Sequence, residues 1–234
     1  MLTRFVPYVS RAAAAEALAT RVAGELEAAL RLRPHATLAV PGGSTPEPFL
    51  RALAEYDLDW ARVVVLPGDE RWVAADDVRA NIALLERAFA GTPAAAATRL
   101  SLLSDAPTPE AGSAEVAARL SGVLGQPPRL DVAVVGLGTD GHTASLFPGG
   151  DHLADALDPA GRALVLPMRA PDAPEPRITL TLPVLAGAGA LHVLAFGAEK
   201  RAILERAAAS PPDAFPISAV AHAAGRAPTI HWAP

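Results

Sequence analysis

The chain of 234 residues contains no cysteine, and this absence removes several kinds of chemistry. Disulfide bonds, thiolate nucleophiles and cysteine-based zinc sites are all excluded. His142 and His152 lack the spacing of metal-ligand pairs, so we expect no metal site. A reducing compartment suits a chain without disulfides, and we expect the protein to be cytoplasmic.

The sequence also lacks a long apolar run and an excess of positive charge. No stretch approaches the length of a membrane span, and the first residues contain no apolar segment typical of a secretory signal. The net charge of −5 argues against non-specific binding to nucleic acid or anionic lipid. We therefore expect neither as a partner, whereas a few well-placed cations could still bind a phosphorylated small molecule.

Hydrophobic residues make up 51% of the chain and charged residues 19%, which is typical of a globular protein. Helices are expected at residues 11–32, from Pro46, over 78–89, and at 109–124 and 199–209. Strands are expected at residues 37–40, 62–66, 130–135, 162–166, 191–196 and 229–232, and a surface loop at 167–176. This alternation predicts an α/β fold, as a single domain over residues 1–234, with a mostly parallel sheet covered by helices on both faces.

The segment DVAVVGLGTDGHTASLFP, residues 131–148, combines a strand, a glycine loop and a titratable pair. It matches G-x-G-x-x-G, but Pro148 comes too soon for the long helix that a dinucleotide site needs. We favour a glycine loop that lines another ligand through Gly138. Asp140 precedes His142 closely, and a neutral imidazole with a nearby carboxylate can accept a proton from water. The alternative is a histidine that is hydrogen-bonded for structure alone.

The segment PGGSTP follows the strand at residues 37–40. Gly42 and Gly43 allow a ligand to approach the backbone, while Ser44 and Thr45 offer hydroxyl groups. A helix that begins at Pro46 would add its positive end, so the segment predicts a phosphate cradle. An ordinary capped turn explains the same residues equally well.

The segment PGDER follows the strand at residues 62–66. Neighbours in extended backbone face opposite ways, so Asp69 and Arg71 are expected to share a face while Glu70 points elsewhere. A carboxylate and a guanidinium could order water or a sugar hydroxyl and stabilise negative charge; a solvated turn is the alternative. Arg177 and Lys200 follow later, and each alone is more typical of a surface charge.

Taken in order, these segments resemble the 6-phosphogluconolactonase family, with RITLTLP and GAEKR as further matches over residues 40–204. The resemblance implies the α/β fold shared with glucosamine-6-phosphate deaminases and ribose-5-phosphate isomerases. It implies hydrolysis of 6-phospho-D-glucono-1,5-lactone, the second step of the oxidative pentose phosphate pathway, without a cofactor. A small sugar-phosphate lactone is the implied partner.

The resemblance also implies roles for individual residues. His142 corresponds to the proposed general base, and Arg71 to a residue that stabilises the oxyanion or holds substrate. Asp69 would orient His142 or the sugar hydroxyls. The implied substrate and phosphate contacts are Gly42, Gly43, Ser44, Thr45, Gly138, Asp140, Arg177 and Lys200.

Two alternatives remain, and one departure is visible. A glucosamine-6-phosphate deaminase would share the fold, but such enzymes typically have a glutamate after the histidine, where this chain reads TASLFP. A non-catalytic sugar-phosphate sensor would need a DNA-binding module, for which the first residues leave no room. The family often has Ser-Asn after its Asp-Glu-Arg segment, whereas this chain has Ala80 before Asn81.

Overall fold

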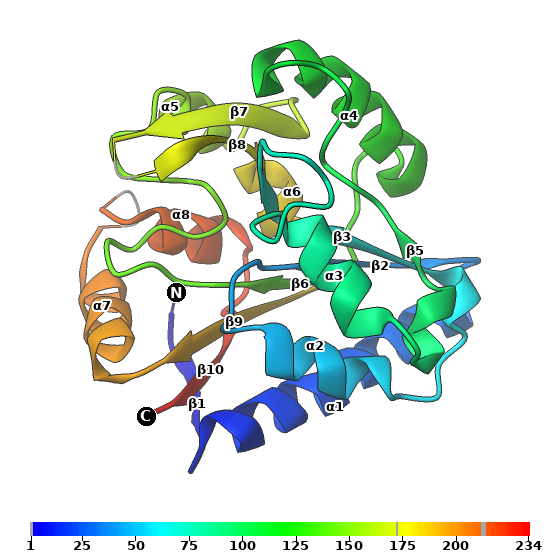
Figure 1. Ribbon diagram of the computed structural model, residues 1–234. Helices are drawn as coiled ribbons and strands as arrows, with labels where there is room; N and C mark the ends of the chain where they lie inside the picture. Colours follow the sequence, from blue (N-terminus) through cyan, green and yellow to red (C-terminus); the bar gives the residue numbers. More distant parts are fainter. Residues whose placement is uncertain (1, 172, 212–213) are drawn as a thin grey trace.

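The computed structural model describes residues 2–171, 173–211 and 214–234, drawn in Figure 1. Within these residues a main sheet has seven strands, and every strand is parallel to its neighbours. Its order is β1 (Arg4–Pro7), β10 (Thr229–Ala233), β9 (Ala190–Phe196), β6 (Val132–Val135), β2 (Ala36–Val40), β3 (Val63–Pro67) and β5 (Thr98–Arg99). A small antiparallel sheet has the order β4 (Asp69–Arg71), β8 (Ala173–Leu180) and β7 (Val165–Ala170).

Helices cover both faces of the main sheet (Figure 1). On one face lie α1 (Arg11–Leu32), α2 (Glu47–Ala54) and α3 (Asn81–Phe89), with short 3-10 turns at Trp60–Arg62 and Pro93–Ala96. On the other lie α4 (Pro109–Leu124), α5 (Leu153–Ala156), α6 (Leu182–Ala186), α7 (Ala198–Ala209), α8 (Pro216–Ala223) and the small sheet. Alternate strand residues supply the two cores, since Leu38 packs on the first face and Ala39 on the second. The predicted fold class is confirmed.

Two helix starts illustrate what local sequence decides. The helix expected at residues 11–32 is confirmed as α1, and the Ser10 hydroxyl caps it by accepting from the Ala13 N–H at 3.1 Å. The helix expected from residue 78 instead begins at Asn81, and Val78 is 77% exposed. The prediction was wrong there because the N–H groups that open α3 are held by a carboxylate from another segment, which periodicity does not reveal.

The surface loop expected at residues 167–176 was also wrong. These residues lie mostly in β7 and β8, which pair antiparallel, and the strand expected at 162–166 begins at Val165. Prolines are tolerated because this sheet is narrow and much of each strand faces no partner on one side. Pro176 still contributes its carbonyl, which accepts from Trp72 N–H at 2.8 Å.

The strand order reverses direction between β2 and β6. From β2 the chain continues outward through β3 to β5, whereas from β6 it continues the opposite way through β9 to β10. The loops that leave β2 and β6 therefore diverge at their carboxyl ends. Such a switch point opens a crevice for ligands in parallel α/β sheets.

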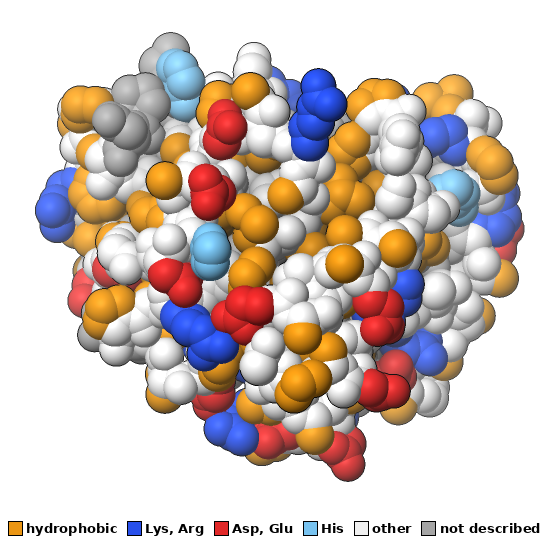
Figure 2. Space-filling model, turned by 90° about the horizontal axis from the view of Figure 1, so that it is seen from above, with side chains coloured by type: hydrophobic (Ala, Val, Ile, Leu, Met, Phe, Trp, Pro, Cys, Tyr) orange, Lys and Arg blue, Asp and Glu red, His pale blue; other side chains and the backbone are white. Residues whose placement is uncertain are grey.

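The face seen in Figure 2 carries charges of both signs. On this face, acidic and basic side chains are interspersed, with no single region of one sign. Among the residues that the structure describes, no helix has both the length and the apolar character needed to cross a membrane.

Candidate active site

A cavity of about 440 Å³ lies where the carboxyl ends of β9, β6, β2 and β3 meet. These four strands are adjacent in the main sheet, so loops far apart in sequence come together there. Most of the predicted site residues line this cavity, namely Gly42, Thr45, Asp69, Arg71, Gly138, His142, Arg177 and Lys200. Gly43, Ser44 and Asp140 are not among its lining residues: Gly43 and Ser44 face a second cavity, and Asp140 contacts His142, as described below.

His142 and Asp140 form a close pair in the loop after β6. Asp140 Oδ1 lies 2.6 Å from His142 Nδ1 and also accepts from the His142 backbone N–H at 3.1 Å. A carboxylate can only accept, so Nδ1 carries the proton and Nε2 holds the lone pair of the neutral ring. The carboxylate that contacts the histidine is therefore that of Asp140, not that of Asp69.

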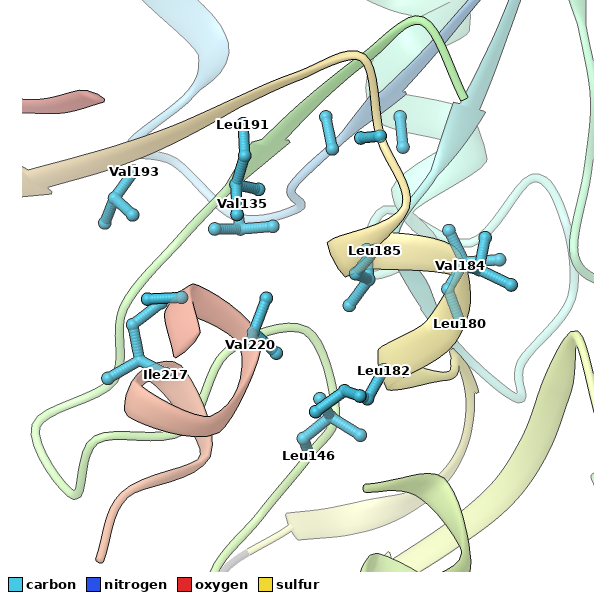
Figure 3. Close-up of a cluster of buried hydrophobic side chains, with 14 of the residues drawn as sticks. Val135, Leu146, Leu180, Leu182, Val184, Leu185, Leu191, Val193, Ile217 and Val220 are labelled. Atoms are coloured by element: carbon cyan, nitrogen blue, oxygen red, sulfur yellow. The ribbon is translucent and has the colours of Figure 1, made fainter. Parts of the chain in front are cut away.

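The loop around His142 is held from both sides. Gly138 N–H donates to the His142 carbonyl at 2.9 Å, and the Thr143 hydroxyl donates to the Gly136 carbonyl at 2.9 Å. Leu146 points into the apolar cluster beneath the loop, near Leu182 (Figure 3). The imidazole thus stands on a loop that is anchored in the core.

Gly138 is required by the histidine itself. A Cβ at this position would lie 2.2 Å from two atoms of the His142 ring and 2.6 Å from Asp140 Oδ1. The absence of a side chain therefore allows the imidazole and carboxylate to pack against the loop backbone. On the other side the ring lies 4.4 Å from the Phe147 ring, centroid to centroid, so its orientation is restricted.

Asp69 is held by a residue that sequence reasoning did not single out. Its Oδ2 accepts from the buried Ser145 hydroxyl at 2.5 Å, and the Ser145 N–H donates to Thr179 Oγ1 at 3.2 Å. Thr179 is the partner of Asp69 in the β4–β8 ladder. The signal was present in the sequence, because Ser145 lies three residues after His142 in the same loop.

Arg71 is fixed by the segment that leads into α3. Its Nη1 donates to the Arg79 carbonyl at 2.6 Å and to Asn81 Oδ1 at 3.1 Å. Asn81 also donates to the Asp69 carbonyl at 2.7 Å, and a Cβ on Gly42 would overlap its amide. Within the described residues, Arg71 Nε is buried without an acceptor, so one donor is unpaired beside the cavity.

Glu70 points away from the cavity, as the alternation of β4 predicts. It is fully buried and accepts from three backbone N–H groups, those of Arg71, Asn81 and Ile82, at 2.6–2.9 Å. Burial raises the pKa of Glu70 to about 7, although these hydrogen bonds act in the opposite direction. The Glu70 carboxylate, on β4, therefore caps the start of α3 and so places Asn81 beside Arg71.

Arg177 and Lys200 supply two further cations. Arg177 lies on β8 opposite Arg71, its guanidinium carbon is 5.7 Å from the Phe147 ring centroid, and burial lowers its pKa. Lys200, the only lysine in the chain, lies in the first turn of α7, and burial lowers its pKa as well. Arg177 is buried and Lys200 is partly buried, so neither is a typical exposed surface charge.

Gly43 and Ser44 face a second, smaller cavity of about 220 Å³. This cavity shares Arg71 and Asn81 with the first, and the PGGSTP loop forms part of the wall of both. The loop therefore presents Gly42 and Thr45 to one side and Gly43 and Ser44 to the other. Across the described residues, no group of three or more histidine, aspartate and glutamate side chains is arranged to hold a metal ion.

Comparison with known proteins agrees with this geometry. The pattern of the family described as glucosamine-6-phosphate isomerases/6-phosphogluconolactonase matches residues 9–232. A 6-phosphogluconolactonase of Rhizobium meliloti (strain 1021) is 44% identical over 223 residues, with 95% of each chain covered. One from Pseudomonas aeruginosa is 41% identical and covers 96% of this chain and 92% of its own length.

Solved structures extend the comparison to the fold. The crystal structure of a 6-phosphogluconolactonase from Shewanella baltica OS155 superposes with a TM-score of 0.92 at 32% identity, covering 99% of this chain and 98% of that one. A monomeric glucosamine-6-phosphate deaminase shares the fold with a TM-score of 0.76 at 16% identity. The chain is therefore an enzyme of the glucosamine-6-phosphate isomerase/6-phosphogluconolactonase family, and it falls on the 6-phosphogluconolactonase side of that family.

Proposed function

We propose that this enzyme hydrolyses 6-phospho-D-glucono-1,5-lactone to 6-phosphogluconate, with His142 as the general base. The observation that carries the proposal is the 2.6 Å contact between Asp140 and His142 at a cavity that three cationic side chains also line. The names of the similar 6-phosphogluconolactonases support the choice of substrate.

The chemistry requires one proton to be moved twice. His142 Nε2 takes a proton from water as the water oxygen attacks the lactone carbonyl carbon. Asp140 stabilises the imidazolium that forms, because its carboxylate holds the Nδ1–H. As the ring C–O bond breaks, the imidazolium returns the proton to the departing oxygen. Water and lactone thereby become a carboxylic acid and a hydroxyl group.

Arg71 would stabilise the negative charge that develops on the carbonyl oxygen. Its guanidinium is held by Asn81 and by the Arg79 carbonyl, so little reorganisation is needed at the moment of attack. The unpaired Nε–H beside the cavity provides a donor for a substrate oxygen. Asp69, with Ser145 on one oxygen, suits contact with sugar hydroxyls.

The phosphate group would be held by Lys200, Arg177 and Thr45. Both cations are partly desolvated, which strengthens their attraction for a dianion. A grip at the phosphate end orients the carbonyl carbon against the water, and such orientation contributes much of an enzymatic rate. Ser44, which faces the smaller cavity, would act on the loop backbone rather than on this phosphate.

The test is a coupled assay on freshly prepared 6-phospho-D-glucono-1,5-lactone, corrected for spontaneous hydrolysis. We expect the unmodified protein to accelerate hydrolysis, and His142→Ala to lower kcat by about 10²–10⁴-fold while circular dichroism stays unchanged. Glucono-1,5-lactone, which lacks the phosphate, should be a far poorer substrate.

Three results would contradict the proposal. Full activity in His142→Ala would remove the general-base role. Equal turnover of the lactone without phosphate would rule out the proposed phosphate-binding role of Lys200, Arg177 and Thr45. Release of ammonia from glucosamine 6-phosphate, with no lactone hydrolysis, would favour the deaminase alternative.

A further inference from the structure

Two arginines face each other across the β4–β8 ladder at the wall of the cavity. The register pairs Arg71 with Arg177, and both side chains line the cavity. Like charges at directly opposed positions destabilise a sheet and push the side chains apart. Something must therefore hold both guanidinium groups toward the same cavity before substrate arrives.

The segment between β4 and α3 supplies one half of this restraint. Arg79 donates to both carboxylate oxygens of Asp77, from Nε at 3.1 Å and from Nη2 at 2.8 Å. These hydrogen bonds hold the pKa of Asp77 well below its usual range, at about 2. The same segment presents the Arg79 carbonyl to Arg71 Nη1 at 2.6 Å.

Glu175 on β8 supplies the other half. Its Oε1 accepts from Arg79 Nη1 at 2.7 Å, and its Oε2 lies 3.7 Å from Arg177 Nη2. The Glu175 carbonyl also accepts from Arg177 Nε at 3.3 Å. The side chains of Glu175 and Arg177 are only 19% and 11% exposed, so this carboxylate is not a freely solvated surface group.

We propose that Arg79 and Glu175 form a clamp that positions the two cavity arginines, Arg71 through the Arg79 backbone and Arg177 through the Glu175 side chain. Both are positioning residues, because neither lines the cavity. The clamp joins the 72–80 segment to the small sheet, so the two arginines hold their orientation together. This inference rests on the proposed function for its role in turnover, but not for its role in anion binding.

The direction in which Glu175→Gln changes the affinity for an anion distinguishes positioning by Glu175 from simple electrostatics. Glu175→Gln removes a negative charge beside an anion site, which by charge alone should tighten anion binding. If Glu175 instead positions Arg177, the same change should weaken binding. We expect the Kd for 6-phosphogluconate, measured by titration calorimetry, to rise about tenfold in Glu175→Gln, with KM for the lactone rising similarly and kcat changing less.

A second substitution tests the other half of the clamp. Arg79→Lys keeps the charge but loses the planar fork that binds two carboxylates, so charge alone predicts no change while the clamp predicts weaker binding. In a protein that already carries Glu175→Gln, Arg79→Lys should raise the Kd for the anion by less than it does alone, because the Arg79–Glu175 bridge is already weakened. Glu27→Gln, which breaks an exposed ion pair with Arg31 on α1, is the matched control.

The urea midpoint of unfolding should stay close to that of the parent protein in each variant, because the Arg79 end of the bridge is 54% exposed and such pairs contribute little to stability. Tighter or unchanged binding in Glu175→Gln, or fully additive effects in the double variant, would overturn the clamp. Inorganic phosphate serves as a second probe. If the unmodified protein binds these anions but does not hydrolyse the lactone, the proposed function fails and the clamp is still tested.

Discussion

At the scale of single residues, the site depends on two glycines, Gly138 and Gly42, because their lack of a side chain leaves room for neighbouring groups. Gly138 leaves room for the imidazole of His142 and the carboxylate of Asp140 in a space that a methyl group would fill. Gly42 does the same for the amide of Asn81. Sequence patterns identify such glycines as a loop, but the side chain that occupies the space is visible only in the folded chain.

We expect Gly138→Ala to lower kcat by about 100-fold or more with little effect on folding. The added Cβ would displace the His142 ring, and a shift of about 1 Å in a catalytic group can cost that much. The control is Gly24→Ala in α1, where a Cβ meets open space and should stabilise the helix by up to about 1 kcal/mol. Steady-state kinetics with a urea melt for each variant checks the prediction, and unchanged kcat in Gly138→Ala would contradict it.

At the scale of elements, the start of α3 is decided by a strand. Glu70 lies in β4, yet its carboxylate satisfies the N–H groups of Asn81 and Ile82 at the helix start. The alternation of β4 then assigns one face to the cavity and the other to this cap. A single three-residue strand thus orders both the charged wall of the site and the helix beside it.

Glu70→Ala should lower the free energy of unfolding by roughly 2–4 kcal/mol, because it leaves buried backbone donors without an acceptor. The pKa of Glu70 is raised in the folded protein to about 7 from its usual 4.5, so its contribution is fully present below pH 4.5 and is lost as the pH rises through 7. The stability difference between the parent protein and Glu70→Ala should therefore be larger at pH 5 than at pH 7. Urea denaturation at both pH values measures it, and a difference that shrinks at pH 5 would refute the assignment.

At the scale of the whole molecule, a row of polar groups centred on two buried histidines joins α1 to the sheet. Glu25 Oε2 lies 2.8 Å from His192 Nε2, His192 Nδ1 lies 3.2 Å from His231 Nε2, and His231 Nδ1 lies 2.9 Å from the Tyr8 hydroxyl. Neutral histidines satisfy every contact if each donates from Nε2 and accepts at Nδ1. The row connects α1, β9, β10 and the segment after β1.

This row makes stability depend on pH. Burial, followed by the neighbouring His192, lowers the pKa of His231 to about 3 from its usual 6.5. Between those pH values the unfolded chain binds a proton that the folded chain does not, so stability is lost as the pH falls below 6.5. At pH 5 the loss from this group is about 2 kcal/mol.

We therefore expect the stability difference between the parent protein and His231→Gln to narrow by about that amount from pH 7 to pH 5. The exposed His222 on α8 offers the matched change His222→Gln as the control for a histidine outside this row. Urea melts at both pH values provide the measurement. A His231→Gln difference that widens on acidification would show that His231 is protonated in the folded state.

Much of the architecture could be predicted from periodicity alone. Residues 36–40, 63–67 and 132–135 are buried along their whole length or nearly so, and their continuous apolar runs indicated parallel strands. The errors fell on segments whose local sequence gives little indication of a strand. The β7–β8 hairpin contains several prolines, and β4 has only three residues, so neither carries a local signal strong enough to predict a strand.

The sequence by itself determined the fold class, the family and the titratable residues that line the cavity, because most of them lie in loops directly after a buried strand. Only the tertiary structure decided which carboxylate serves which partner. Asp140 contacts His142, Asp69 contacts Ser145, Glu70 caps α3 and Glu175 bridges two arginines. The physical reason is that a carboxylate binds whichever donor the packed elements bring within about 3 Å, and residue order does not specify that distance.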